Sequence, residues 1–370
     1  MTGLLLQTPL YRWHVAKGAK MVPFAGYEMP VQYPSGVLRE HQHTRGFAGL
    51  FDVSHMGQIE VLGENITEIL ETIFPADLVG LPVNHQCYSL LMNGEGGVID
   101  DLMICRREYD FILVVNAACK QGDFEYLQAQ IGDKLELKML DDRALLALQG
   151  PKAAQVLSDL GVNINNMHFM DGDWLEIQGI ECWVTRSGYT GEDGFELSVA
   201  NDKAEKLAEL LCQHEAVLPI GLGARDSLRL EAGLCLYGHE LNQLTTPVEA
   251  SLNWAIAKPR RAGGERQGGF YGAEVVLRQM VEGTDKKRIG LIAEGRAPVR
   301  EGAKLYDDED NEIGEVCSGG FAPTLNKPIA MAFVDSSAAG LKQVYAGVRG
   351  KKLPMNQAGM PFVPTHYYRG

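Results

Sequence analysis

The sequence predicts an α+β protein of two or three domains. Its 370 residues are too many for one hydrophobic core. Apolar residues alternate with polar ones in some segments, as in half-buried strands, and recur every three or four residues in others, as in amphipathic helices. Beyond about residue 285, short strands follow one another across Gly- and Asp-rich turns, which indicates a separate all-β module.

A strand–helix–three strands–helix–strand series occupies about residues 52–140. Asn65 is expected to cap the first helix, with Glu68 three residues further on. The second helix carries Phe124, Leu127 and Ile131 at helical spacing. Such a series is typical of an α+β unit in which helices back antiparallel strands. The expected strands are 58–61, 87–92, 97–104, 111–116 and 135–140.

The next part, to about residue 275, mixes strands with helices. Strands are expected at 174–177, 181–186 and 195–199, one helix after Asp202, and another over 227–233. Residues 258–267, rich in Arg, Gly and Glu, are predicted to form a mobile loop. The all-β module that follows has expected strands at 288–293, 304–306, 311–316 and 329–334.

Composition excludes several classes of function. A formal net charge of -14 is unsuited to binding nucleic acid, which needs a basic face. No apolar run approaches the roughly 20 residues that span a bilayer, and residues 1–7 resemble neither a signal nor a transit peptide. Seven scattered cysteines indicate reduced thiols, and nine dispersed histidines predict no metal site. We expect a cytoplasmic protein, or a mitochondrial matrix protein if a leader has been removed.

Residues 96–101 (Gly-Gly-Val-Ile-Asp-Asp) place a two-glycine turn before a strand with adjacent carboxylates. Neighbouring side chains on a strand point to opposite faces, so Asp100 and Asp101 cannot do the same job. One should face solvent or neighbouring backbone, and the other a covered face. A carboxylate on a buried face must be paired, protonated or part of a functional pocket. The alternative is an ordinary turn aspartate that caps the loop.

Residues 189–196 (Tyr-Thr-Gly-Glu-Asp-Gly-Phe-Glu) place a turn before a strand. Glu196, projecting from that strand, could accept two hydrogen bonds from a flat heterocycle with adjacent N–H groups. The alternative is a tight hairpin with Glu192 and Asp193 in solvent.

Residues 221–226 (Gly-Leu-Gly-Ala-Arg-Asp) do not fit the dinucleotide-binding fingerprint, because Asp226 stands where the last glycine belongs. Arg225 then lies near a helix start, where the helix dipole repels a cation. Either a structural salt bridge or an anionic ligand would hold it there.

Taken together, these segments resemble the T-protein (aminomethyltransferase) family of the glycine cleavage system. The resemblance spans essentially the whole chain, in order. One departure is Phe-Tyr-Gly-Ala at 270–273, where the family usually has a basic residue after the glycine. The matching segments are 51–56 (Phe-Asp-Val-Ser-His-Met), 96–101, 189–196, 221–240, 246–254 (Thr-Pro-Val-Glu-Ala-Ser-Leu-Asn-Trp) and 361–368 (Pro-Phe-Val-Pro-Thr-His-Tyr-Tyr).

The resemblance implies a tetrahydrofolate-dependent enzyme with three domains around a central channel. We expect a discontinuous α+β domain at 1–51 and 141–275, a ferredoxin-like domain at 52–140, and a C-terminal β-barrel domain at 276–370. The family takes an aminomethyl group from the lipoyl arm of the H-protein and makes methylenetetrahydrofolate, ammonia and the reduced arm. No metal, membrane or nucleic acid is implied, and we expect a monomer.

The resemblance also implies roles for particular residues. Asp101 falls on the family's catalytic carboxylate, and Glu196 on the residue that grips the pterin ring. Arg225 and Tyr367 fall on folate-contacting positions. The same pocket is lined at positions matched by Met56, Tyr88, Val115, Asn116 and Tyr189.

The docking partner implied is the lipoyl H-protein, bound transiently. Because the chain is acidic and the partner is usually acidic too, docking should use a local basic patch. The candidates are Lys258, Arg260, Arg261, Lys286, Lys287 and Arg288.

Two other functions remain open on the sequence. One is another tetrahydrofolate-dependent transferase of this fold, such as a sulfonium demethylase or the folate half of a dimethylglycine or sarcosine oxidase. The oxidases need a flavin domain for which this chain has no room. The other is a non-catalytic folate-binding module, like iron–sulfur-cluster accessory proteins with a Lys-Gly-Cys-Tyr signature. Residues 232–237 (Ala-Gly-Leu-Cys-Leu-Tyr) lack that run, and Asp101 is retained.

Overall fold

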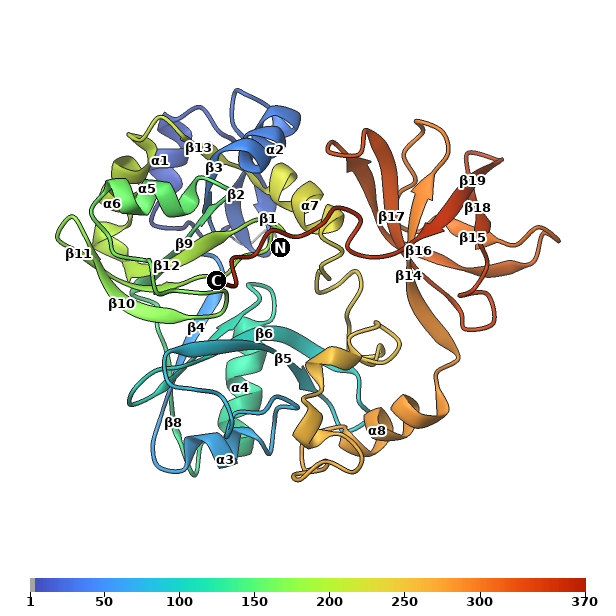
Figure 1. Cartoon of the computed structure of the whole chain (residues 1–370), viewed down its shortest axis with the longest axis horizontal. Helices are drawn as coiled ribbons and strands as arrows, with labels where there is room; N and C mark the ends of the chain where they lie inside the picture. Colours follow the sequence, from blue (N-terminus) through green and yellow to red (C-terminus); the bar gives the residue numbers. More distant parts are fainter. Residues whose placement is uncertain (1–3) are drawn as a thin grey trace.

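The computed structural model describes residues 4–370 and contains three main sheets (Figure 1). They are a six-stranded sheet, a five-stranded sheet and a closed six-stranded barrel. The α+β fold class and the C-terminal barrel are therefore confirmed. The prediction about a leader concerns residues 1–7, of which 1–3 lie outside the described residues.

The six-stranded sheet is covered on both faces by helices. For that reason its strand β9 (Arg143–Gln149) is a nearly continuous apolar run. Leu146 and Leu148 pack on one face, and Leu145 and Ala147 on the other. The first face is covered by α1 (Tyr11–Ala16), α5 (Ala153–Asp159) and α6 (Asn201–Cys212), the second by α2 (Val37–Gly46) and α7 (Leu222–Glu231). The strands, in sheet order, are β10 (Gly172–Ile177), β11 (Ile180–Thr185), β12 (Gly194–Ala200), β9 (Arg143–Gln149), β3 (Ala48–Asp52) and β13 (Val217–Ile220).

The α7 helix begins five residues earlier than predicted, at Leu222. Gly221 is its extended N-cap, and a Cβ there would come within 2.5 Å of the Val31 backbone. Arg225 consequently lies in the opening part of the helix, as expected.

The five-stranded sheet is antiparallel and shares a core with α3 (Ile66–Leu70) and α4 (Lys120–Ile131). Asn65 is the N-cap residue of α3, as predicted, but its side chain makes no capping hydrogen bond. Its backbone is left-handed, with φ of 53°, and Glu68 accepts a hydrogen bond from Thr67 instead. In sheet order the strands are β5 (His85–Met92), β6 (Val98–Arg106), β7 (Phe111–Val115), β4 (Gly57–Leu62) and β8 (Glu136–Met139).

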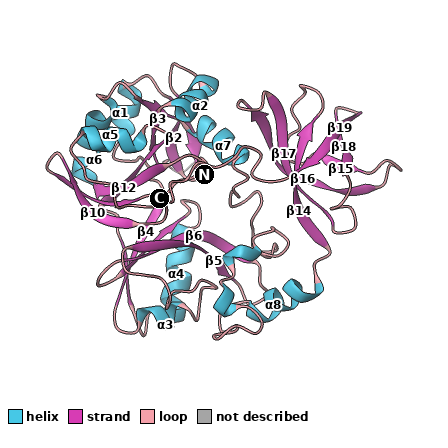
Figure 2. Cartoon of the chain, in the orientation of Figure 1, coloured by secondary structure: helices cyan, strands magenta, loops and turns pink. Residues whose placement is uncertain are grey.

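The C-terminal sheet closes on itself, and Figure 2 shows strands and loops there without helices. Closure leaves no unpaired edge, and small and branched apolar side chains fill the interior. In barrel order the strands are β14 (Lys286–Ala293), β17 (Lys327–Asp335), β16 (Glu312–Ala322), β15 (Lys304–Tyr306), β18 (Gln343–Val348) and β19 (Lys351–Ala358). Two of these, β18 and β19, had not been predicted, and neither had the hairpin of β1 (Lys20–Phe24) and β2 (Tyr27–Gln32).

The connection from the first sheet to the barrel carries two 3₁₀ turns, η1 (Asn253–Ala255) and η2 (Lys258–Arg260), and α8 (Ala273–Glu282). The prediction of a mobile loop at 258–267 is wrong. Arg260 is 4 % exposed, forms an ion pair with Glu71, and donates to the carbonyl oxygens of Glu71 and Gly268. Arg266 bonds the same carboxylate, so two guanidinium groups fix this segment to the end of α3.

The last residues form a C-terminal strap, defined here as 359–370, that leaves the barrel and returns to the first sheet (dark red in Figure 1). Four backbone hydrogen bonds hold it: Phe362 and Val363 both donate to Glu231, His366 donates to Gly191, and Phe169 donates to Tyr368. Glu231 also accepts bonds from Arg45 and from Thr324 of the barrel. The strap and this carboxylate together tie the barrel to the first sheet.

Within residues 4–370, no helix combines the length and the apolarity required to cross a membrane. All seven cysteines are free, and Cys105, Cys182, Cys235 and Cys317 are buried. The exact domain boundaries, and the central channel, stay predictions.

Candidate active site

Asp101 is positioned by a tight turn and by its place on β6, which pairs with β5 and β7. The Asn93 side chain accepts hydrogen bonds from the backbone N–H groups of Glu95 and Gly97, closing the turn. Gly97 has no space for a side chain, because a Cβ there would lie 1.9 Å from the carbonyl oxygen of Gln243. The two glycines of the motif therefore let the turn pack against the 242–245 loop.

The Asp101 carboxyl group is held by two donors. The Tyr88 hydroxyl donates to Oδ2 at 3.0 Å, and the Asn116 amide donates to Oδ1 at 2.9 Å. Burial, followed by the nearby charge of Asp100, raises the pKa of Asp101 from 3.8 to about 7. A carboxyl group of this pKa can both hold and release a proton at neutral pH.

Asp100 lies on the buried side of the strand, with no exposed surface. It accepts hydrogen bonds from the backbone N–H of Asn116 and from the Asn116 amide, both at 2.9 Å. Of the two expected environments, neighbouring backbone is therefore the one observed. As strand alternation predicts, the two aspartates differ in exposure. The Asn116 amide nevertheless donates a hydrogen bond to each of them.

Tyr88 and Trp254 form an aromatic pair beside Asp101, with ring centroids 5.0 Å apart and an angle of 34° between the planes. Burial raises the pKa of Tyr88 well above 10, so its hydroxyl stays protonated and donates to Asp101. Trp254 is 59 % exposed, which leaves ring surface open for a flat ligand. Trp254 was not singled out from the sequence, although it ends the matching segment 246–254.

Arg225 has no carboxylate partner among residues 4–370, and its side chain makes no hydrogen bond there. Its guanidinium group lies over the Tyr189 ring, 4.7 Å from the centroid. Burial lowers the pKa of Arg225, while the charge of Glu196 favours the cation. Of the two possibilities left open by the sequence, the structural salt bridge is therefore not formed, and the guanidinium donors remain available to an anionic ligand.

Glu196 projects from β12 and accepts a hydrogen bond from the Ser187 hydroxyl at 2.8 Å. No lysine, arginine or histidine of the described chain forms an ion pair with it. One carboxylate oxygen is thus free to accept from a ligand N–H. Ser187 was missed in the sequence, since nothing in a lone serine marks it.

Tyr189 is linked to both Asp101 and Arg225. Its hydroxyl donates to the carbonyl oxygen of Cys235, and burial raises its pKa. The charges of Asp101 and Arg225 both act on this hydroxyl. Burial is the main reason why the pKa of Tyr88 is raised, and Tyr189 in turn contributes to that rise. The structure therefore brings Asp101, Tyr88, Tyr189 and Arg225 into one neighbourhood.

The remaining predicted residues are not all placed beside Asp101. Val115 ends β7, is 1 % exposed, and pairs with Gly57, the residue that follows Met56. Tyr367, on the strap, stacks on Phe169 with ring centroids 4.1 Å apart. Within residues 4–370, no hydrogen bond or ring contact joins Tyr367 to Asp101, so its role stays a prediction.

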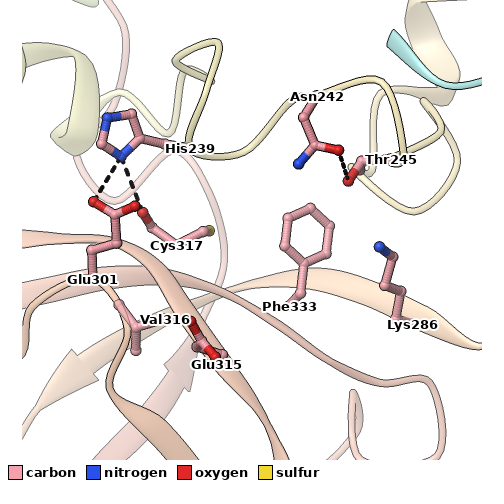
Figure 3. Close-up of a pocket in the computed structure, with 9 residues that line it drawn as sticks. All are labelled: His239, Asn242, Thr245, Lys286, Glu301, Glu315, Val316, Cys317 and Phe333. Carbon is pink, nitrogen blue, oxygen red and sulfur yellow. Dashed lines mark hydrogen bonds and ion pairs between the residues drawn. The ribbon is translucent and has the colours of Figure 1, made fainter.

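Two cavities lie away from Asp101. One of about 360 Å³ includes Met56 and Lys120 in its lining. Another of about 220 Å³ lies against the barrel, and Figure 3 shows His239 facing Glu301, with Phe333 and Lys286 on the strands below Thr245. Neither cavity includes Asp101, so the candidate site is identified by its side-chain chemistry. Among the described residues, no cluster of three or more His, Cys, Asp or Glu side chains could hold a metal ion.

Comparison with known proteins agrees with this chemistry. Two family profiles match: the GCVT N-terminal domain over residues 10–260, and the glycine cleavage T-protein C-terminal barrel domain over residues 286–364. A mitochondrial aminomethyltransferase from Dictyostelium discoideum is 45 % identical, covering 98 % of this chain and 94 % of its own. One from Pisum sativum is 43 % identical, covering 99 % and 91 %.

A solved structure is also similar. The glycine cleavage system aminomethyltransferase T of Bartonella henselae superposes with a TM-score of 0.93 at 44 % identity, covering 99 % of this chain and all of that one. The fold and these relatives define a group-transfer enzyme. The chain belongs to the glycine cleavage T-protein family, whose members are aminomethyltransferases. The resemblance stated from the sequence is confirmed, and so is the expectation of an enzyme.

Proposed function

We propose that this enzyme transfers the methylene carbon of an aminomethyl group, carried on the lipoyl arm of the H-protein, to tetrahydrofolate and releases ammonia. The observation that carries the proposal is Asp101: a carboxyl group with a pKa of about 7, held by Tyr88 and Asn116. Tyr189 is acted on by the charges of both Asp101 and Arg225, and this arginine has no carboxylate partner among residues 4–370.

The residues present fit tetrahydrofolate. Glu196 has a carboxylate oxygen free to accept N–H groups of the pterin, and Arg225 has donors free for an anionic group. Tyr88 and Trp254 offer ring surface for a flat heterocycle. We assign the remaining contacts to Tyr189, Tyr367, Met56, Val115 and Asn116.

Tetrahydrofolate supplies the amine that takes up the one-carbon unit. Asp101 orients that amine, accepts the proton it loses, and stabilises the positive charge that develops on the carbon. The hydrogen bonds from Tyr88 and Asn116 fix the carboxyl group, so it needs no rearrangement during the reaction. One acidic side chain is sufficient for these roles.

The test is an assay of methylenetetrahydrofolate formed from tetrahydrofolate and aminomethylated H-protein. Asp101→Asn should lower turnover far more than it weakens folate binding, as for a group that acts in the transition state. Glu95→Gln, an exposed residue in the turn before the same strand, is the control of equal charge change. An active Asp101→Asn would defeat the proposal. Folate binding without any product would instead indicate a non-catalytic module.

The H-protein is the proposed partner. The relatives named above are mitochondrial proteins, whereas for this chain both the cytoplasm and the mitochondrial matrix stay predictions. The monomeric state is also a prediction.

A further inference from the structure

Two further carboxyl groups lie behind the proposed catalytic residue Asp101, so that three form one cluster. Asp100 is 0 % exposed and Asp123 1 % exposed, while Asp101 is half-buried. Asp123 lies within hydrogen-bond reach of Asp100, and Asn116 connects Asp100 to Asp101. Among residues 4–370, no lysine, arginine or histidine forms an ion pair with any of these three. Three buried negative charges without a cation would be very costly, so at least one group must carry a proton.

Asp123 is the group best suited to hold that proton. It belongs to the buried face of α4, in line with Leu127 and Ile131 four and eight residues further on. Neither of its oxygens receives a hydrogen bond from any donor in the described chain. A carboxyl group that accepts nothing can form a hydrogen bond only by donating one, and Asp100 is the acceptor beside it.

The other groups facing the pair do not change this conclusion. Cys119, from the turn before α4, can donate its S–H to Asp100 and remains a neutral thiol because burial raises its pKa. Tyr237 is also neutral, since burial raises its pKa to about 12. Lys120 is committed elsewhere, donating to the Tyr27 hydroxyl and the His55 carbonyl oxygen. Burial and the Asp100 charge raise the pKa of Asp123 to about 10, which agrees with the geometry.

We propose that Asp123 is a positioning residue. As a neutral carboxylic acid it donates a hydrogen bond to Asp100 and thereby orients Asn116 toward Asp101. This inference rests on the proposed role of Asp101. The bond from Asp123 keeps Asp100 an anionic acceptor in a buried place. Asp100 then takes the backbone N–H and one amide hydrogen of Asn116, leaving the other hydrogen for Asp101.

The orientation matters because the amide of Asn116 has two different ends. Its nitrogen donates to Asp100, to the Asp101 side chain and to the Asp101 carbonyl oxygen, at 2.9 to 3.0 Å. Without a charged Asp100 as acceptor, the reversed amide would place an oxygen against the Asp101 carboxylate. The electrostatic setting of Asp101 therefore depends on a residue that does not touch it.

A first experiment requires no activity. Infrared difference spectra of the whole protein at pH 8, wild type minus Asp123→Asn, should contain the C=O stretch of a protonated carboxylic acid that is lost in the variant. Asp133→Asn is the control, because this exposed aspartate just beyond α4 should contribute only carboxylate bands. A carboxylate band lost from Asp123→Asn would overturn the inference.

A second experiment compares Asp123→Asn with Asp123→Leu in the transfer assay. The asparagine amide can still donate to Asp100, so kcat should stay within about threefold and the pH profile should keep its position. Leucine has a similar volume and no donor, so kcat should fall about ten- to hundredfold while KM for tetrahydrofolate changes little. A fully active leucine variant, or an asparagine variant impaired as much as the leucine variant, would overturn the inference. An active Asp101→Asn would instead indicate failure of the proposed function, and the infrared result is independent of both.

Discussion

The proposed function of Asp101 and the stability of the fold make opposite demands on the Asp101 carboxyl group. Its pKa in the folded protein, about 7, exceeds the ordinary value of 3.8, so the folded state binds the proton more tightly than the unfolded chain does. Deprotonation therefore destabilises the fold. The penalty is absent below about pH 4, grows as the pH rises, and is complete above about pH 7.

Asp101→Asn should for this reason be more stable than the wild type at pH 8 while being inactive. One pKa unit corresponds to about 1.4 kcal/mol, so the gain amounts to at most a few kcal/mol. Thermal unfolding at pH 5 and pH 8 measures it: the difference in Tm between variant and wild type should widen with pH. Glu95→Gln should leave the difference near zero at both values. A gain that shrinks with rising pH would contradict the assigned proton affinity.

Glu196 should hold the pterin ring. Removing one partner of a partly buried, charge-assisted hydrogen bond costs about 2–3 kcal/mol. Glu196→Ala is thus expected to weaken tetrahydrofolate binding by tens- to hundredfold in calorimetry, with the fold intact. Glu176→Ala, on exposed β10 of the same sheet, is the matched control. Unchanged affinity in Glu196→Ala would remove Glu196 from the site.

These residues could be predicted from the sequence to different degrees. Alternation on a strand was enough to distinguish Asp100 from Asp101, but the role of Asp101 came from the family resemblance. Arg225 was left between a salt bridge and a ligand, because pairing across 30 or more residues is not visible in a sequence. Asp123 was overlooked, although an acid spaced four and eight residues from Leu127 and Ile131 marks a charged group on an apolar face.

At the scale of elements, the segment after η1 is the clearest difference between sequence and structure. Its Arg and Gly content is typical of a solvated loop, yet Glu71 lies about 190 residues earlier in the chain and binds both Arg260 and Arg266. The composition of a segment describes only that segment. It does not reveal that Glu71, distant in the sequence, forms ion pairs with Arg260 and Arg266.

Glu71→Gln should release this segment. The change leaves Arg260, 4 % exposed, without its counter-charge, and breaking a buried pair in this way costs about 3–5 kcal/mol. We expect a lower urea midpoint and faster trypsin cleavage within residues 258–267. The control is Glu282→Gln, an exposed position at the end of α8. If cleavage and midpoint were both unaltered, the two arginines would not be what anchors the segment.

Other elements were predictable where the pattern is local. Strand and helix periodicities located β4 to β7, α4 and α6 well. The hairpin β1–β2 and the strand β19 were missed because their exposed and buried positions alternate irregularly. The strand β18 alternates over Gln343–Ala346 and was overlooked. The parallel contact of β13 with β3 joins segments about 170 residues apart, which no local pattern indicates.

For the whole molecule, docking of an acidic partner must overcome a net charge of -14. The structure corrects the proposed basic patch: Arg260 and Arg288 are buried, at 4 % and 5 % exposure, and cannot meet a partner. Lys258 and Lys287 are exposed, and Lys286 and Arg261 are partly exposed.

Lys258→Gln combined with Lys287→Gln should therefore raise the KM for H-protein severalfold and flatten its salt dependence, because steering charges act through a screened field. The matched control is Lys203→Gln with Lys206→Gln on α6, on the opposite side of the molecule from β14 (Figure 1). Equal behaviour of the two double variants would move the docking surface elsewhere.

The C-terminal strap has a consequence for how the protein is made. Phe362 and His366 donate backbone hydrogen bonds to Glu231 and Gly191, and the carbonyl oxygen of Tyr368 accepts one from Phe169. During translation the two earlier sheets can form before the barrel leaves the ribosome, but these bonds cannot form until residues 359–370 have emerged as well. The barrel is therefore tied to the first sheet later than the sheets themselves can fold. A chain cut before residue 359 should keep its three sheets but lose these bonds, and since Tyr367 is a predicted folate contact, it should also bind tetrahydrofolate more weakly.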